Sequence, residues 1–423
     1  MKERFILHCD CNGFFASVEL LQYPHLKDKP VAVGGDNETR HGIVLAKNEA
    51  AKKYGVKTAE TLWQARKKCP DLIVLPPHHS EYTRYSKIIN GIYTQYTDLV
   101  EPFGIDESWL DVTNTYKMFA DSPQQLADQL RERVKYETGL TISVGVSFNK
   151  IFAKLGSDYK KPDATTVISR ENYKDIVYPL PVGDLLYVGK STQNALNEMG
   201  IRNIGQLAET PQEILERRFG KHGIMLYEYA NGLENSPVES YYAEKEVKSV
   251  GSGNTFSRNL SGLAEIKPAL MSLSEDVGMR LRKHGMYANG VQLTIRDPDF
   301  YTFSRQMQLP STDVTNDIYK TAVDLFVKNY SLTKPVRALT VTAIDLEKEK
   351  RVAQLSLFET GQTEQDDKKE KLQATIDRIR GKYGNRSVQS ATVMTNPLKK
   401  DKKQNPFGDK PERPGRNWDK NDM

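Results

Sequence analysis

Short apolar runs separated by helical patterns fill residues 1–168 of the chain. Runs of apolar and β-branched residues predict strands, and they lie at 5–10, 31–34, 42–46, 72–75, 105–112, 141–146 and 165–168. Leu126, Leu130 and Val134 recur every four residues, so we expect a helix over 122–137. Lysine-rich stretches at 46–57 and 62–69 predict helices of a small inserted subdomain. The alternation of strands and helices predicts a mixed sheet of the ferredoxin-like type.

Residues 170–235 change to a helical pattern punctuated by glycines. Gly189, Lys190 and Ser191 begin one helical run, and the segment 200–205 has a glycine at each end. Two helices joined by a glycine turn expose backbone N–H groups at their starts, which suit a phosphate. We expect these three residues to contact a nucleic-acid backbone without reading base sequence. An ordinary helical hairpin is the alternative.

A second α/β unit follows a linker at 236–246. Its strands are expected at 248–256, 290–295, 301–308 and 338–345, and its helices at 266–284 and 314–327. From residue 350 the chain is mostly polar and charged. We expect disorder over 362–369 and from residue 399 onward, with a short helix at 370–380 between them.

Size and composition narrow the protein class. The 423 residues allow about three domains, and 38% hydrophobic with 27% charged residues is ordinary for globular proteins. The net charge of +5 fits a polyanionic partner without requiring one. Cys9, Cys11 and Cys69 form neither a disulfide framework nor a zinc spacing. We expect a cytoplasmic protein with no signal peptide and no membrane-spanning segment.

Three acids lie in apolar, strand-like runs. Asp10 ends the run at 5–10, and Asp106 and Glu107 lie within 103–111. A charge in such a run is costly unless it is paired or bound to a cation. Two buried strands that meet and carry acids form an oxygen-rich site suited to Mg²⁺, and two such ions assist phosphoryl displacement. The alternative is that these carboxylates pair with Lys or Arg.

The geometry of a strand limits how these acids converge. Neighbours on a regular strand point to opposite faces, so Asp106 and Glu107 share one site only if the chain bends there. Gly104 makes such a bend plausible. The same alternation places the Cys11 side chain opposite Asp10, although the Cys11 carbonyl remains available as a ligand.

Several motifs together resemble one enzyme family. After Asp10 the segment 11–19 reads Cys-Asn-Gly-Phe-Phe-Ala-Ser-Val-Glu, which resembles the opening of the Y-family translesion DNA polymerases, most closely their DinB branch. Gly-Ile-Asp-Glu-Ser at 104–108 resembles the second catalytic motif of the family. Residues 147–155 and the Lys-Lys-Pro at 160–162 resemble the third. The similarity covers about residues 1–350.

The resemblance implies an α/β multidomain (α+β) architecture. It combines a ferredoxin-like palm, small fingers, a helical thumb with a helix-hairpin-helix, and a separate α/β little finger. The implied bounds are palm 1–20 and 78–168, fingers 21–77, thumb 169–235, linker 236–246, little finger 247–349 and a mostly disordered tail 350–423.

The resemblance also implies a reaction. It is template-directed addition of dNTPs to the primer 3′ end of primer-template DNA, at low fidelity, past damaged bases and without proofreading. Two Mg²⁺ ions would be bridged by Asp10 and Asp106, with Glu107 and the carbonyl of Cys11 completing the site. The implied nucleotide-binding residues are Phe14, Phe15, Lys52 and Lys161, and Phe15 would face the sugar and exclude rNTPs.

The chain departs from the family pattern at two places. The fingers of the DinB branch usually carry a Tyr and an Arg that grip the triphosphate, and Glu49 and Lys52 stand there instead. A lysine holds phosphate as a point charge, without the two-pronged contact of arginine. Tyr187 stands where a hairpin glycine is common.

A second motif follows the last expected domain. Gln-Leu-Ser-Leu-Phe at 354–358 resembles a bacterial sliding-clamp-binding peptide, in which Gln354, Leu355, Leu357 and Phe358 would contact the clamp. Exposed apolar residues in a charged region need such a partner or an intramolecular pocket. The alternative is a final strand packed on the little finger. We expect a monomer that is tethered by this peptide.

Two other functions remain open at this point. A non-catalytic, clamp-linked DNA-binding accessory of polymerase fold would explain the altered fingers. A nucleotide cyclase would use the same palm, but it needs no thumb, little finger or clamp peptide.

Overall fold

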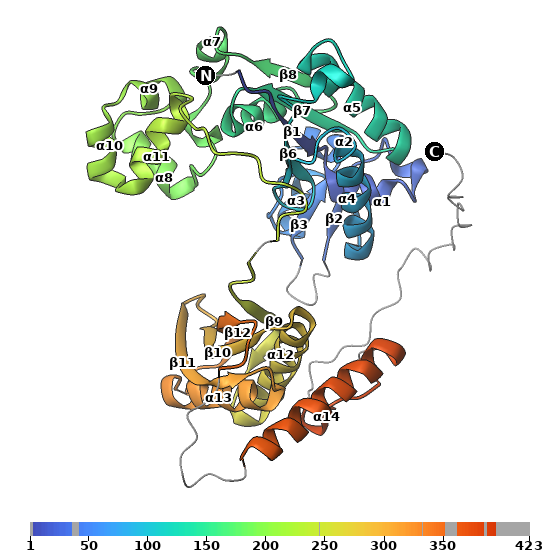
Figure 1. Cartoon of the computed structure of the whole chain (residues 1–423), viewed down its shortest axis with the longest axis vertical. Helices are drawn as coiled ribbons and strands as arrows, with labels where there is room; N and C mark the ends of the chain where they lie inside the picture. The colour runs from blue at the N-terminus through green and yellow to red at the C-terminus, as the bar shows by residue number, and fades with distance from the viewer. Residues whose placement is uncertain are drawn as a thin grey trace. The chain divides into compact units, whose positions relative to one another are not determined.

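The computed structural model describes residues 3–35, 42–244, 246–331, 333–351, 362–384 and 387–394. These residues form two compact units that meet in sequence near residue 245, and each unit is described by itself (Figure 1). No helix among the described residues is long and apolar enough to cross a membrane.

A five-stranded sheet forms the centre of the first unit. Its strand order is β5 (Val100–Pro102), β6 (Glu107–Asp111), β1 (Ile6–Cys11), β7 (Ile142–Ser147) and β8 (Thr165–Ile168). β1 is antiparallel to both of its neighbours, and all six of its residues are buried. The first motif acid, Asp10, therefore lies on the innermost strand.

Helices cover both faces of this sheet (Figure 1). Leu7, Cys9 and Cys11 of β1 face a core shared with α1 (Phe14–Leu20), α4 (His79–Tyr93) and α5 (Pro123–Thr138). The alternation of the strand sends His8 and Asp10 to the other face, where α6 (Lys150–Tyr159) packs. The 3₁₀ helices η1 (Pro24–Leu26) and η3 (Tyr116–Met118) are short connections.

A glycine allows α6 to lie close to the sheet. A Cβ at Gly145 of β7 would lie 1.9 Å from the carbonyl oxygen of Ala153 and 2.5 Å from the backbone nitrogen of Ser157. No side chain fits there, because both neighbours are backbone atoms of α6. This close approach fixes the distance at which α6 presents its side chains to β1.

The inserted subdomain has a sheet of its own. β2 (Val31–Gly34) lies between β3 (Val44–Lys47) and β4 (Ile73–Leu75), with α2 (Glu49–Lys53) and α3 (Leu62–Lys68) packed beside them. Asn48 caps α2 by accepting a hydrogen bond from the backbone N–H of Ala51 at 3.0 Å. A capping box starts α3 at Thr61.

The helical part expected for the thumb is confirmed. It consists of α7 (Tyr173–Val177), η4 (Val182–Asp184), α8 (Lys190–Glu198), α9 (Ile204–Glu209), α10 (Gln212–Phe219) and α11 (Lys221–Ala230). Phe152 of α6 shares its core with Leu196, Ile204 and Leu226 of these helices. The structure places Tyr187 at φ 68, a left-handed conformation that favours glycine.

Part of the expected linker lies against the first unit. Val238 is buried beside Trp109. The backbone N–H of Glu239 donates to a carboxylate oxygen of Glu101 at 2.9 Å, and that of Tyr241 donates to the carbonyl of Asp98 at 3.1 Å. The chain leaves this unit only after these contacts.

The second unit is a four-stranded antiparallel sheet. Its order is β11 (Thr302–Thr312), β10 (Tyr287–Arg296), β12 (Val336–Glu347) and β9 (Val250–Leu260). α12 (Leu263–His284) and α13 (Thr315–Asn329) cover one face (Figure 1). Val277 and Phe326 belong to the core beneath them. The expected strands and helices of this unit are confirmed, each longer than its apolar run.

The region after residue 350 corrects one expectation. A helix, α14, runs over Gln362–Tyr383, so the disorder expected at 362–369 is wrong. Arg282 of α12 pairs with Asp377, and the buried Arg380 pairs with Glu275 at 3.2 Å. The Glu- and Lys-rich composition that suggests disorder also has high helix propensity, which is consistent with a helix that begins at residue 362. Residues 354–358 and those from 399 onward lie outside the described residues.

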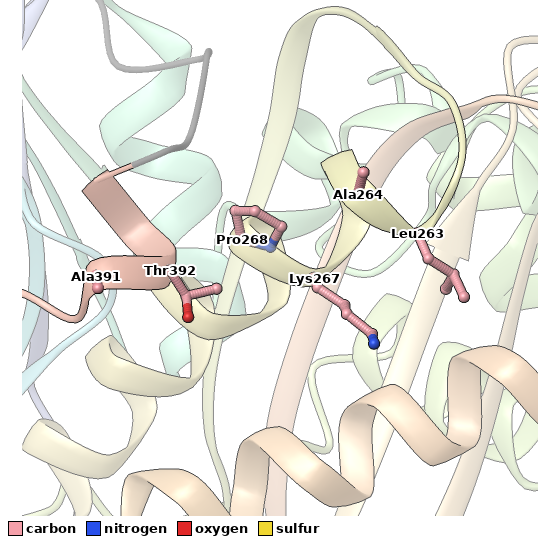
Figure 2. A pocket seen from close by; sticks show the side chains of 6 residues that line it. All are labelled: Leu263, Ala264, Lys267, Pro268, Ala391 and Thr392. Carbon is pink, nitrogen blue, oxygen red and sulfur yellow. The ribbon is translucent and has the colours of Figure 1, made fainter.

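A short helix, α15 (Ala391–Met394), lies across the first turns of α12. Figure 2 shows the pocket between them, lined by Leu263, Ala264, Lys267, Pro268, Ala391 and Thr392. Its lining has one ionisable side chain, Lys267, and no carboxylate. The pocket therefore lacks the ligands for a hard cation.

Substitution of Gly145 by Ala tests the packing of α6. The added methyl group would overlap the backbone of α6, so we expect a loss of about 3 kcal/mol or more in the free energy of unfolding. Gly91→Ala on α4 is the matched control, because nothing lies within 4 Å of its Cβ position. That control is expected to raise stability by about 0.5–1 kcal/mol. Denaturant unfolding of both variants checks the contrast, and equal effects would contradict it.

Candidate active site

Two of the motif acids face each other across neighbouring strands. Asp10 of β1 is the register partner of Glu107 of β6. Like charges directly opposite on one face of a sheet repel, so this pair requires cations nearby. The register therefore places two acids at the ends of two interior strands, where nearby positive charge must balance them.

The third acid lies in the bend that leads into β6. β5 and β6 form a hairpin, and Gly104 in its loop has φ 89. The backbone N–H of Cys11 donates to the carbonyl of Asp106 at 3.1 Å, which holds this loop beside the end of β1. The expected bend is confirmed, and β6 begins at Glu107 rather than at residue 105.

One group of side chains has the spacing of metal ligands among the residues that the structure describes. Ligand atoms of His8, Asp10 and Glu107 lie within 4.8 Å of one another. Asp106 is outside this group. Burial and the nearby charge of Glu107 raise the pKa of Asp106, so its carboxyl still belongs to the same electrostatic cluster.

Two lysines of the third motif neutralise these acids. Lys154 Nζ lies 2.8 Å from Glu107 Oε2 and 3.6 Å from Asp10 Oδ2. Lys161 Nζ lies 2.8 Å from Asp10 Oδ2. Both lysines also reach the carboxylate of Asp158, at 3.4 Å and 2.8 Å respectively. In this arrangement their ammonium groups balance the acid pair.

The pKa values of the two facing acids move in opposite directions. Burial raises the pKa of Asp10 to about 7, although the charge of Lys161 opposes this shift. Burial also acts to raise the pKa of Glu107, but the His8 ring and the charge of Lys154 lower it to about 2. When no metal is bound, Glu107 therefore stays ionised at pH values where Asp10 is protonated.

His8 lies behind the acids and has no part in the sequence prediction. Its side chain is fully buried, its Nδ1 lies 2.8 Å from Ser157 Oγ, and its Nε2 lies 3.4 Å from Glu107 Oε2. Burial lowers the pKa of His8 to about 4, so the ring is neutral. The sequence signal that could have identified His8 is its position as a polar residue in an apolar strand, two residues before Asp10.

The donor set fits a hard divalent cation. Asp10 and Glu107 supply carboxylate oxygens, which Mg²⁺ prefers. His8 Nε2 and Glu107 Oε2 are buried and lie 3.4 Å apart, and Lys154 Nζ lies 2.8 Å from Glu107 Oε2. Buried polar atoms of this kind are costly unless another group completes their environment.

The aromatic side chain of Phe15, on α1, packs against α4. The ring of Phe15 stacks on Tyr82, with centroids 4.0 Å apart and planes at 9°. Tyr82 is held in turn by a hydrogen bond from its hydroxyl to Glu19 Oε1 at 2.6 Å. Phe14 is buried in the core, so only its backbone remains for a nucleotide. Phe15 is half-buried and presents a rigid ring edge.

Comparisons with known proteins identify the family of the chain. Residues 9–158 match the impB/mucB/samB family and residues 247–357 match the C-terminal domain of the same family. Residues 183–234 match the thumb domain of DNA polymerase-iota. DNA polymerase IV of Acetivibrio thermocellus is 47% identical, over 93% of this chain and 98% of its own length. The chain belongs to the Y-family DNA polymerases, in the DNA polymerase IV (DinB) branch.

Further relatives support the same assignment. DNA polymerase IV 1 of Bacillus subtilis is 38% identical over 93% of this chain and 94% of its own length. Among solved structures, a Y-family DNA polymerase chimera matches with a TM-score of 0.72 at 25% identity, over 82% of this chain and 100% of its own. DinB from Sulfolobus solfataricus matches with a TM-score of 0.55 at 25% identity, over 80% of this chain and 98% of its own. The chain is thus a translesion DNA polymerase, and the cyclase and accessory alternatives are dropped.

The fingers of the polymerase carry two neighbouring lysines, Lys47 and Lys52, and the first of them touches the turn that follows β1. Lys52 and Glu49 form an ion pair at 3.5 Å, and both side chains are half exposed. Lys47 is half-buried, and its Nζ donates to Thr58 Oγ1 at 3.1 Å. Burial and the charge of Lys52 lower the pKa of Lys47. The carbonyl of Lys47 would lie 2.9 Å from a Cβ at Gly13, so this strand end touches the turn after β1.

The thumb residues of the polymerase lie at a helix start. Gly189 is the N-cap of α8, with no side-chain cap, and Lys190 and Ser191 form its exposed first turn. Their backbone N–H groups face solvent and are available to a phosphate. The expected clamp residues Gln354, Leu355, Leu357 and Phe358 lie outside the described residues.

Asp10→Asn tests the electrostatics of the acid pair. Because folding raises the pKa of Asp10 from 3.8 to about 7, ionised Asp10 is disfavoured in the folded state. Wild-type stability relative to the variant is therefore expected to fall as pH rises across this interval, and the variant should melt higher at pH 8 in EDTA. Thermal melts across pH check this. A variant that melts lower than wild type at pH 8 would show that the lysine partners stabilise ionised Asp10, which would contradict the raised pKa.

Proposed function

We propose that the polymerase joins dNTPs to the primer at two Mg²⁺ ions held by Asp10, Asp106 and Glu107. The cross-strand pairing of Asp10 with Glu107, opposed by two lysines, is the observation that carries this proposal. When bound, such ions activate the primer 3′-hydroxyl and neutralise charge on the triphosphate. The carbonyl of Cys11, next to Asp10 at the end of β1, is proposed as a further oxygen ligand.

Lys161 is proposed to hold the triphosphate. Its ammonium group lies 2.8 Å from a carboxylate oxygen of Asp10 and 2.8 Å from one of Asp158. Lys161 is therefore shared between two carboxylates beside the site. A nucleotide bound at the acids would bring its phosphates within reach of this side chain. Asp158 keeps the lysine in place when the nucleotide leaves.

Lys52 is proposed as the second phosphate contact, on the fingers. Its pairing with Glu49 is exposed and contributes little to stability, so a triphosphate competes with it easily. In the free enzyme, the carboxylate of Glu49 neutralises the ammonium group of Lys52. A point-charge contact of this kind holds the phosphates with less geometric constraint than arginine does.

Phe15 is proposed to exclude ribonucleotides. Its ring is fixed by the stack on Tyr82 and by the edge of His79, whose ring centroid lies 6.0 Å away. A ring that cannot turn aside leaves no room for a 2′-hydroxyl on the sugar it faces. The rigidity of this aromatic group supports the role.

DNA and a clamp are the proposed macromolecular partners. Gly189, Lys190 and Ser191 would bind the phosphate backbone of primer-template DNA through helix N-terminal N–H groups. Residues 354–358 would bind a sliding clamp, which holds a weakly processive enzyme on its template. The enzyme is proposed to act as a monomer.

Primer extension with Mg²⁺ tests the acid assignment. Asp106→Ala and Glu107→Gln are each expected to lose on the order of 10³-fold in rate, because each would remove about 4 kcal/mol of charge stabilisation. Glu137→Ala, which breaks a surface pair with Arg133, is the control and should keep full activity. Variants that bind DNA, stay folded and extend primers normally would refute the assignment.

Phe15→Ala tests the exclusion of ribonucleotides. Opening the pocket is expected to raise rNTP use relative to dNTP use by about 10-fold to 100-fold, the range that pocket shape supplies. Tyr82→Phe is the matched control, since it keeps the stacked ring and removes only the hydroxyl. Single-nucleotide kcat/KM values for dNTP and rNTP measure the ratio. An unchanged ratio in Phe15→Ala would remove Phe15 from this role.

Leu357→Ala and Phe358→Ala test the clamp peptide. Both are expected to abolish the stimulation of primer extension by a bacterial sliding clamp while leaving clamp-free extension intact. Ser356→Ala, at the variable position of the motif, is the matched control and should respond like wild type. Equal stimulation of all variants would show that these residues do not bind the clamp.

A further inference from the structure

His8 lies in a fixed environment on the same face of β1 as Asp10. It is the register partner of Trp109 on β6, and the two rings meet edge to face with centroids 5.3 Å apart. Trp109 is held by a hydrogen bond from its Nε1 to the carbonyl of Lys150 at 2.9 Å. The imidazole is therefore enclosed by the sheet, an indole and α6, and its side chain is fully buried.

Each ring nitrogen of His8 meets one polar side chain. Nδ1 lies 2.8 Å from Ser157 Oγ, and Nε2 lies 3.4 Å from Glu107 Oε2. A neutral imidazole carries one proton, which can reside on either nitrogen. The negative charge of Glu107 favours the tautomer with the proton on Nε2. Ser157 then donates its hydroxyl proton to Nδ1, in competition with the Lys154 carbonyl 2.8 Å away.

Both contacts of Glu107 fall on one oxygen. Lys154 Nζ lies 2.8 Å from Oε2, and His8 Nε2 lies 3.4 Å from the same atom. Oε2 is also buried. The second oxygen, Oε1, has neither of these two contacts.

We propose that His8 is a positioning residue that, with Ser157 behind it, fixes the orientation in which Glu107 presents its carboxylate to a divalent cation. The inference rests on the proposed function, in which Glu107 is a metal ligand. Lys154 is charged and long, so it can shift when a cation arrives. The buried ring cannot shift, and it keeps the carboxylate in the binding orientation in both states.

Groups that orient a ligand from behind have a measurable effect on metal affinity. Losing such a contact typically weakens binding about 10-fold to 100-fold. The loss should appear in metal affinity without a matching loss of fold stability, because Glu107 remains present but is free to rotate. The effect should be smaller than the loss caused by removing the Glu107 charge itself.

Binding of Mn²⁺ to the full-length protein, followed by the electron paramagnetic resonance signal of free Mn²⁺, tests the proposal. His8→Phe keeps a flat ring without nitrogen atoms, and His8→Gln keeps an N–H donor near the position of Nε2. Ser157→Ala removes the contact behind the ring. Cys9→Ala is the matched control, since Cys9 is equally buried on β1 but faces the opposite side of the sheet. Glu107→Gln is the reference, and thermal melts accompany each titration.

The expected result is a graded loss of affinity. His8→Phe should bind Mn²⁺ about 10-fold to 100-fold more weakly than wild type. His8→Gln should recover most of the affinity, Ser157→Ala should fall between them, and Cys9→Ala should match wild type. The order of affinities should not follow the order of melting temperatures.

Three results would overturn the proposal. Wild-type affinity in His8→Phe, with a weakened Glu107→Gln, would remove the positioning role and leave the metal site intact. Nitrogen coupling to bound Mn²⁺ in electron spin-echo spectra would make His8 a ligand instead. Unchanged affinity in Glu107→Gln would instead refute the proposed function, on which this inference rests.

Discussion

The pairing of two carboxylates across the β1–β6 register is the constraint on which the catalytic half of this polymerase depends. Asp10 and Glu107 lie directly opposite each other, where two like charges destabilise a sheet. The burial that raises the pKa of Asp10 adds to this cost. The fold accommodates the pair because Lys154, Lys161 and His8 surround it. The acid pair thus lowers the stability of the fold at the proposed cation site, and such a loss of stability is common at active sites.

Helix α6 supplies most of what the acid pair needs. Lys154 and Ser157 belong to the helix, and Asp158 follows in its last turn. They reach the acids because Gly145 lets the backbone of α6 touch β7. A single glycine therefore connects the packing of the sheet to the electrostatics of the site. The same helix carries Phe152 into the thumb core, so it also joins the sheet of the first unit to the thumb helices.

The sequence predicts the elements better than it predicts the contacts between their side chains. Buried strands such as β1 are visible as apolar runs, and the bend at Gly104 follows from the need for two neighbouring acids to converge. β5 was missed because three residues ending in Pro102 give too short a pattern. The first part of helix α14, residues 362–369, was missed because its charged composition is typical of disorder as well as of an exposed helix.

The candidate site shows the same division. The structure brings Asp10, Glu107 and Lys161 together, and these residues were predicted from motifs, as were Asp106 and Phe15. His8, Ser157 and Asp158 were not, because their importance comes from distances between strands and helices that are far apart in sequence. Lys47 was missed for the same reason, since its relation to Gly13 exists only in the folded chain. Phe14 was placed at the nucleotide by its motif, whereas its ring lies in the core.

The most direct measurement is a crystal structure of the full-length polymerase with primer-template DNA, a non-hydrolysable dNTP and Mn²⁺, located by anomalous scattering. We expect ion peaks in contact with carboxylate oxygens of Asp10, Asp106 and Glu107. We also expect Lys154 to move away from Glu107 while the His8 ring stays in place. Ions bound without Asp106 or Glu107 would contradict the proposal that these three acids form the catalytic metal site.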